Sequence, residues 1–222
     1  MRGPPKALIF DLDGTLVDSA PDIARALNAG FGPLGAPPFP LAQVASFIGN
    51  GASVTIDRAA AFARLELTTA QIADVTARFF DTYAVASAEG NGLYPGALEL
   101  LAGLERQGTP LGLVTNKSEP ITHIALAALG ITRHFTAIVG ARDDRPKKPD
   151  PAGLHAAMTL LGASPAEVVM IGDSAADIGA AKAAGCRSIA VSYGYTRVPP
   201  AELGATLVVD RLSDIPAALA RL

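Results

Sequence analysis

An uninterrupted apolar run near the N-terminus, Ala7–Phe10, most constrains what this chain can fold into. The run lacks the polar alternation of a half-exposed strand, so it predicts a strand that is buried in a parallel sheet. Two carboxylates follow directly, Asp11 and Asp13, and then Gly14 and Thr15. In open α/β sheets, ligands bind beyond the carboxyl ends of the strands. Two acids at such an end indicate a cation-binding site, a nucleophile or both. The alternative is a strand that ends in a polar turn, because Asp and Gly are common turn residues.

From Leu93 onward, short apolar runs alternate with helical segments, which is typical of α/β folds. Each run is followed by polar or glycine residues, as expected where a buried strand ends. The runs that we predict as strands are Leu111–Val114, Ala137–Val139, Val168–Ile171, Ser188–Val191 and Thr206–Val209. Together with the first run, they predict a sheet of five or more parallel strands.

The stretch between the first strand and this alternating part has a different pattern. It contains no convincing strand, and a Gly/Pro-rich patch and the tripeptide GNG separate its helical segments. The helices predicted there are Pro21–Phe31, Leu41–Ile48, Ala52–Ala63 and Thr69–Ser87. The pattern therefore predicts an all-helical insertion of about 70 residues.

This insertion divides the chain into two predicted domains. Residues 1–15 and 91–222 form the α/β core, and residues 16–90 form a helical cap that interrupts it. The chain passes between the two domains twice, near Leu16–Ser19 and near Glu89–Leu93. We expect the hinges of the cap at these two places, and Gly90 and Gly92 in the second of them allow the backbone angles to change.

Composition excludes several classes of protein. Lys and Arg number 18 and Asp and Glu number 21, so the formal charge is 18 − 21 = −3, and no basic footprint for nucleic acid is present. The sequence contains no run of 18 apolar residues, so no membrane span is predicted. Asp11 ends the first apolar run too early for a signal peptide. A single cysteine, Cys186, requires no oxidising compartment. We expect a soluble cytoplasmic protein, as a monomer or a homodimer.

Polar side chains follow several of the predicted strands, and we expect these strand ends to lie at one edge of the sheet. Together they supply carboxylates, a hydroxyl, an amide and a cation: Asp11, Asp13, Thr115, Asn116, Lys147, Lys148, Asp173 and Asp177. That set suits phosphoryl transfer, which needs a nucleophile, a divalent cation and donors for three equatorial oxygens. Mg²⁺ prefers oxygen ligands and keeps several waters, so a few carboxylates suffice to hold it.

The segments DLDGTLVDS, LVTNK, KKP and VVMIGDSAADI follow one another along the chain. In this order they resemble the four motifs of the haloacid dehalogenase superfamily of phosphohydrolases. The resemblance extends over nearly the whole chain, and the position of the cap matches the helical type of that family. It implies a doubly wound, Rossmann-like parallel sheet and a Mg²⁺-dependent mechanism.

The resemblance also implies roles for the acids. Asp11 is the expected nucleophile, which attacks phosphorus and becomes an aspartyl phosphate. Asp13 is the expected general acid for the leaving alkoxide and then the general base for water. Mg²⁺ is expected at the Asp11 carboxylate, the Asp13 backbone carbonyl and Asp173. Asp177, one helical turn further, is expected to orient the site rather than to bind the metal.

The remaining motif residues are expected to bind the phosphoryl group. Thr115 and the backbone of Asn116 would hold its oxygens, and a lysine would pair with both the phosphate and the nucleophile. The family pattern favours Lys148, which directly precedes Pro149, and Lys147 is the alternative.

Single residues argue against other reactions of the superfamily. Haloacid dehalogenases do not need the second acid, which is present here as Asp13. Phosphonate hydrolases use a cap lysine, and residues 16–90 contain none. Mutases of the β-phosphoglucomutase type carry a cap histidine where this chain has Ile23. Hydrolysis of a phosphate monoester remains.

The cap string FIGNGASV places Gly49, Asn50 and Gly51 at a predicted helix N-terminus, whose free N–H groups attract an anion. A plain glycine break between helices is the alternative. Together with LYPG, TNK, KKPDP and GYTR, the string resembles the bacterial phosphoglycolate phosphatase branch of the family. This implies a small phosphorylated metabolite, 2-phosphoglycolate, whose carboxylate binds at the three residues. Pyrophosphate, sugar phosphates, amino-sugar phosphates and a non-catalytic phosphometabolite-binding module stay as alternatives.

Overall fold

The computed structural model describes residues 5–90 and 92–222. Within these residues, six strands form one sheet in the order β3-β2-β1-β4-β5-β6, and every neighbouring pair is parallel. The strands are β1 (Ala7–Phe10), β2 (Leu111–Ser118), β3 (Ala137–Ala141), β4 (Val168–Gly172), β5 (Arg187–Val191) and β6 (Leu207–Val209). The parallel sheet that the apolar runs predict is thereby confirmed.

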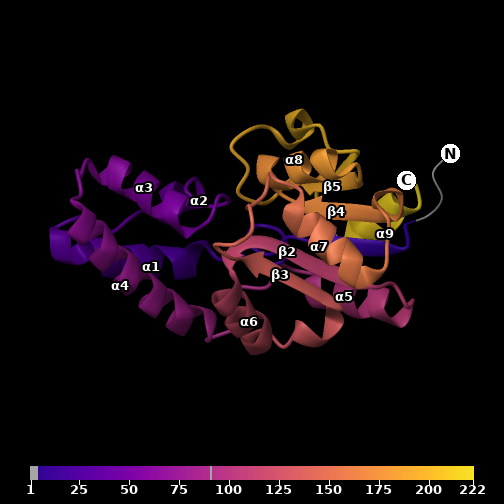
Figure 1. The fold of residues 1–222 in the computed structure, drawn as a ribbon, viewed down its shortest axis with the longest axis horizontal. Helices are drawn as coiled ribbons and strands as arrows, with labels where there is room; N and C mark the ends of the chain where they lie inside the picture. The colour runs from indigo at the N-terminus through magenta and orange to yellow at the C-terminus, as the bar shows by residue number, and fades with distance from the viewer. Residues whose placement is uncertain (1–4, 91) are drawn as a thin grey trace.

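Helices cover both faces of the sheet (Figure 1). They are α5 (Ala97–Arg106), α6 (Glu119–Ala128), α7 (Ala152–Leu161), α8 (Ala175–Ala184) and α9 (Ile215–Leu219). Successive residues of β1 point to opposite faces, so Leu8 and Phe10 pack with α5 and α9, whereas Ala7 and Ile9 pack with α7 and α8. Burial on both faces explains why β1 reads as a continuous apolar run, and the doubly wound, Rossmann-like prediction is confirmed.

The segment after β1 forms a separate group of helices, which Figure 1 shows at one end of the molecule. These helices are α1 (Ala20–Phe31), α2 (Leu41–Ala45), α3 (Ala52–Ala63) and α4 (Thr69–Ser87). They pack around their own apolar cluster, which includes Phe31, Phe47 and Phe79. Helix α2 ends three residues earlier than predicted, because the Ser46 hydroxyl donates to the Gln43 carbonyl and competes with the helical pattern.

Short 3₁₀ helices complete the described secondary structure. They are Gly32–Leu34, Thr132–His134, Pro165–Glu167, Pro200–Leu203 and Leu212–Asp214. None of the helices in residues 5–90 and 92–222 is both long and apolar enough to cross a membrane.

The chain enters and leaves the helical group at two adjacent places. The Asp18 amide donates to the Gly92 carbonyl at 2.7 Å, and the Tyr94 amide donates to the Leu16 carbonyl at 2.9 Å. The two predicted crossing points therefore lie side by side, although Asn91 in the second of them falls outside the described residues. The bounds of the predicted domains, at 15/16 and 90/91, stay a prediction.

The sheet order places the polar strand ends together. Strand β1 lies between β2 and β4, where the direction of strand addition reverses, and such a switch point is where open α/β sheets bind ligands. Strand β2 continues four residues beyond the predicted Leu111–Val114, with an irregular register against β3 after Val114. Thr115 and Asn116 thus belong to the end of a strand, which fixes their backbone.

Candidate active site

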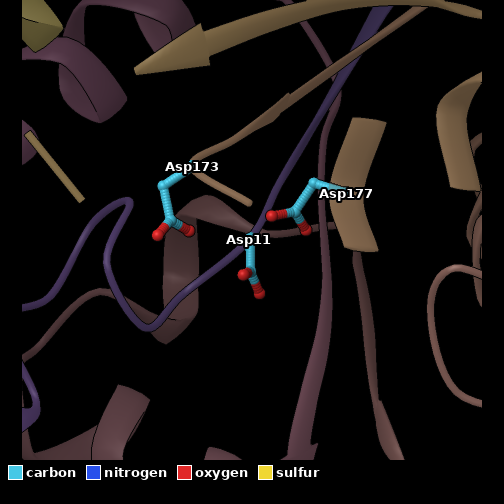
Figure 2. A group of neighbouring side chains, drawn as sticks. All are labelled: Asp11, Asp173 and Asp177. Atoms are coloured by element: carbon cyan, nitrogen blue, oxygen red, sulfur yellow. The ribbon is translucent and has the colours of Figure 1, made fainter. Parts of the chain in front are cut away.

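Three buried carboxylates form the centre of the site. Asp11 follows β1, Asp173 follows β4, and Asp177 lies in the first turn of α8. Each contributes an oxygen to a group in which all such atoms lie within 4.8 Å of one another. Figure 2 shows the three carboxylates close together beyond the strand ends. The two parallel strands and the helix that follows β4 bring them together.

The carboxylates of Asp173 and Asp177 are oriented by neighbouring donors. Asp173 Oδ2 accepts from the Tyr195 amide at 2.6 Å, and its Oδ1 accepts from the Thr15 hydroxyl at 3.3 Å. Asp177 Oδ2 accepts from the amide and the hydroxyl of Ser174, which together form a capping box at the start of α8. The backbone contact from Tyr195 is one that the sequence analysis missed, because nothing in the sequence shows which loop returns to β4.

Lys148 lies inside this carboxylate group. Its ammonium is 2.9 Å from Asp11 Oδ1 and donates to Asp177 Oδ1 at 2.6 Å and to the Val114 carbonyl at 2.7 Å. Burial alone would lower the pKa of Lys148, but Asp11 and Asp177 outweigh burial and hold the pKa above its usual value. Lys147 is exposed instead, and its ammonium lies beside Gly51 of the helical segment. The structure thus places Lys148, and not Lys147, against the expected nucleophile.

The buried group carries an excess of negative charge. Asp11, Asp173 and Asp177 contribute −3 when ionised and Lys148 contributes +1, so the sum is −3 + 1 = −2. Burial, and then the charge of Asp177, raises the pKa of Asp11 to about 7. Burial, and then the charges of Asp177 and Asp11, also raises the pKa of Asp173 well above its usual range. A divalent cation bound between these carboxylates would offset the repulsion between their charges and favour their ionised forms.

The donors present fit Mg²⁺. All are oxygens, and the buried Asp11 Oδ1 has no donor in hydrogen-bond geometry among the described residues, although the Lys148 ammonium forms an ion pair with it at 2.9 Å. Asp177 fits the metal less well, because one of its oxygens accepts from Lys148 and the other from Ser174. Asp11 and Asp173 are therefore the side chains best placed to hold the ion.

A second lysine, Lys117, lies beside Asp13 and was missed by the sequence analysis. Its ammonium is 3.1 Å from Asp13 Oδ1, donates to the Tyr83 hydroxyl and lies 4.1 Å from the centre of the Tyr83 ring. Tyr83 belongs to α4, so this contact joins the helical segment to the sheet. The lysine of the TNK string was the available signal, but its burial depends on a helix more than 30 residues away.

The end of β2 and the cap loop also meet. Thr115 is buried at the strand end, and the Asn116 amide nitrogen donates to the carbonyls of Gly49 and Lys148, each at 3.0 Å. The Asn116 oxygen accepts from the Lys148 amide at 2.9 Å. The Asn116 side chain therefore links the Lys148 loop to the cap loop, and the residue also lines the cavity.

The structure separates the three cap residues that the sequence groups together. Gly51 is the N-cap of α3 with φ of 89°, a conformation that favours glycine, and Gly49 and Gly51 both line the cavity with Asp11. Asn50 instead accepts a hydrogen bond from Arg58 at 2.9 Å and lines a neighbouring cavity.

The catalytic cavity is small, about 40 Å³, which is space for about three waters. It is lined by Asp11, Asp13, Ile23, Ile48, Gly49, Gly51, Ala52, Thr55, Phe79, Phe80, Tyr83, Thr115, Asn116, Lys117 and Ser118. A larger cavity of about 250 Å³ shares Ala52, Phe80, Asn116 and Ser118 with it, and Lys147 lies on its wall. The site cavity therefore adjoins a larger cavity between the helical segment and the sheet.

Comparisons with known proteins show the family to which the chain belongs. The family described as "Haloacid dehalogenase-like hydrolase" matches residues 8–191. A protein of Pectobacterium atrosepticum named phosphoglycolate phosphatase is 41% identical, with 95% of this chain and 90% of that protein covered. A Rhodospirillum rubrum protein of the same name is also 41% identical, with 95% and 89% covered.

A solved structure shows the same fold. A crystal structure from Haemophilus somnus, described as a predicted phosphoglycolate phosphatase, superposes with a TM-score of 0.91 at 33% identity. The match covers 96% of this chain and 97% of the other. The similarity therefore includes both the sheet and the helical segment.

Proposed function

Because the chain belongs to the haloacid dehalogenase-like hydrolase family, we propose that it is a phosphoric monoester hydrolase whose substrate is 2-phosphoglycolate. The family resemblance of its motifs is confirmed by the match over residues 8–191. The observation that carries the proposal is the contact of Lys148 with Asp11 inside a buried carboxylate group, whose net charge is −2 when its acids are ionised. Such a group suits a phosphoryl-transfer site, where a cation and a metal ion offset the charge of an anionic substrate.

The chemistry has two steps. An Asp11 carboxylate oxygen attacks phosphorus in line, the bond to the ester oxygen breaks, and Asp13 gives its proton to the leaving alkoxide. Asp13 then takes a proton from water, which attacks the aspartyl phosphate and releases inorganic phosphate with Asp11 regenerated. Lys148 pairs with the phosphoryl oxygens, and Thr115 and the backbone of Asn116 hold them in place.

Mg²⁺ would be held by the carboxylates of Asp11 and Asp173 and by the backbone carbonyl of Asp13. When bound, it offsets the repulsion between the nucleophile and the anionic phosphate. Asp177 acts through Lys148, which it anchors at 2.6 Å.

The choice of substrate rests on the names of the relatives and on the size of the site. Two relatives that are 41% identical carry the name phosphoglycolate phosphatase. The cavity of about 40 Å³ favours a leaving group of few atoms over a sugar. Residues 16–90 would act as the cap over the core of residues 1–15 and 91–222, with Gly49 and Gly51 in its roof. A cytoplasmic location stays a prediction from composition.

Steady-state kinetics against a panel of phosphate esters tests this function. We expect the highest kcat/KM for 2-phosphoglycolate, with lower values for pyrophosphate, sugar phosphates and amino-sugar phosphates, and loss of activity when Mg²⁺ is chelated. A preferred substrate that lacks a carboxylate would refute the substrate. Absence of Mg²⁺-dependent hydrolysis of any ester would refute the reaction and favour a binding module.

A further inference from the structure

Lys117 is a second buried lysine at the site, and the chemistry above gives it no task. Its side chain is 3% exposed, at the end of β2. Among the described residues that line the catalytic cavity, it is the one cation. A buried ammonium is costly unless it is paired, so its partners indicate what it is there to do.

The contacts of Lys117 leave part of its donor capacity unused. An ammonium has three N–H donors, and here Asp13 and the Tyr83 hydroxyl take two of them. Within residues 5–90 and 92–222, the third donor has no hydrogen-bond partner. Burial, and then the charges of Asp13 and Asp22, raises the pKa of Tyr83 well above its usual range, so this hydroxyl stays neutral. It orients the ammonium without neutralising it.

The surroundings of Lys117 favour an anion with few atoms. Ile23, Ile48 and Phe79 line the same cavity, and an apolar wall strengthens the attraction between charges. Asp22, which is partly buried near the start of α1, feels the charge of Lys117 as well, but burial is the larger influence on it and raises its pKa. Asp13 is therefore the one acid in direct contact with this ammonium among the described residues.

The position of Lys117 next to Asp13 relates it to the leaving group. Asp13 must reach the ester oxygen in order to protonate it, and Lys117 Nζ lies 3.1 Å from an Asp13 oxygen. In 2-phosphoglycolate, one methylene separates the ester oxygen from the carboxylate carbon. A cation that touches the acid is therefore placed to reach a carboxylate at that short spacing.

We propose that Lys117 binds the substrate's carboxylate and is the residue that selects 2-phosphoglycolate among small phosphate esters. Tyr83 orients it from α4, so the cation takes its position when the helical segment closes over the sheet. This inference rests on the proposed function and assigns the carboxylate a side chain in addition to the Gly49 and Gly51 loop.

The test compares two esters of the same shape on the full-length protein with saturating Mg²⁺. One is 2-phosphoglycolate, and the other is 2-phosphoglycolamide, in which an amide replaces the carboxylate. We expect Lys117→Met to lower kcat/KM for 2-phosphoglycolate by about 10- to 150-fold, the effect of losing a charged hydrogen bond, and that for the amide by less than about threefold. Lys117→Arg, which keeps the charge, should retain part of the preference.

Two controls separate this role from others. Lys182→Met removes a lysine from the exposed side of α8, where it donates to the Leu203 carbonyl, and should leave both esters unchanged. Tyr83→Phe should lower only the preference for the carboxylate, because it removes one orienting contact. If Lys117→Met is unfolded in a thermal melt, Lys117→Arg and Tyr83→Phe supply the same comparison.

The outcomes are distinguishable. An equal loss for both esters means that Lys117 acts through Asp13 or through the fold, and it overturns this inference alone. An unchanged preference in Lys117→Met also overturns it. If the wild-type protein itself does not prefer 2-phosphoglycolate to the amide, the proposed function fails first, independently of any variant.

Discussion

Lys148 and Asp177 form a buried ion pair with 2.6 Å between Nζ and Oδ1, and both side chains are at most 2% exposed. Because the other Asp177 oxygen accepts from Ser174, the pair is attached to the first turn of α8. Helix α8 therefore fixes the cation that meets the nucleophile. Asp177 thus sets the position of the Lys148 charge beside Asp11.

Removal of this cation should affect stability as well as activity. In Lys148→Met, Asp11 and Asp177 lose their buried partner, so we expect a destabilisation of about 3–5 kcal/mol and loss of turnover. The matched variant Lys147→Met changes an exposed side chain and should stay within about 0.5 kcal/mol of the wild type. Urea unfolding in EDTA measures both. Equal destabilisation by the two variants would contradict the placement of Lys148.

Asp11→Asn should abolish turnover and yet stabilise the metal-free protein at alkaline pH. The pKa of Asp11 is raised from 3.8 to about 7, mainly by burial, so the ionised carboxylate destabilises the folded state. The penalty is absent below pH 3.8, grows between pH 3.8 and 7, and is complete above pH 7. In EDTA at pH 8 we expect the variant to be more stable by roughly 2–4 kcal/mol, with no difference near pH 4.

Chemical denaturation at several pH values, with turnover measured in parallel, checks this prediction. Retained hydrolysis in Asp11→Asn would remove Asp11 from the nucleophile's role. A stability difference that does not change with pH would contradict the burial of an ionisable group.

Protons should compete with Mg²⁺ at the same carboxylates. Because the metal needs the ionised form of Asp11, we expect a constant Mg²⁺ affinity above about pH 8 and a loss of about tenfold per pH unit below pH 7. The raised pKa of Asp173 makes the loss steeper. Calorimetric titrations between pH 5.5 and 8.5 measure it. An affinity that stays constant over this range would be inconsistent with a metal at these residues.

Gly14, the residue after Asp13, should affect the metal site because a side chain at this position would collide with Asp173. Gly14 has φ of 86°, and a Cβ there would lie 2.5 Å from Asp173 Oδ2, so Gly14→Ala should displace that carboxylate. We expect a Mg²⁺ requirement raised by about 10- to 100-fold. Gly108→Ala is the matched control, since its φ of 71° brings a similar strain of about 1–2 kcal/mol but no atom lies within 4 Å. Equal Mg²⁺ titrations of the two variants would contradict the prediction.

Part of the site could be predicted because parallel strands end at one edge. Asp11, Thr115 and Asp173 each follow an apolar run, and a sheet order with β1 between β2 and β4 brings such ends together. The preference for Lys148 over Lys147 came from the family pattern, and the structure places the two lysines on different sides of the loop. These features depend on local sequence and on topology.

Other features depend on contacts that the sequence does not encode locally. Lys117 contacts Tyr83 of a separate helix, and Asp173 is oriented by the backbone of Tyr195, 22 residues further on. Asn50 belongs to the cap string but accepts a hydrogen bond from Arg58 and lines a neighbouring cavity. Side-chain direction in a loop follows from packing between elements, which a single sequence does not determine.

The two crossings of the chain lie one hydrogen bond apart, with the Tyr94 amide on the Leu16 carbonyl. The inserted segment therefore begins and ends at neighbouring points of the sheet domain, whatever the length of the segment. A gene that lost, gained or exchanged this segment would leave the strand order and the carboxylates in place. A replacement for this segment would therefore meet the sheet at one place in the backbone, but it would also have to supply the contacts that Tyr83 and Gly49 now make to Lys117 and Asn116.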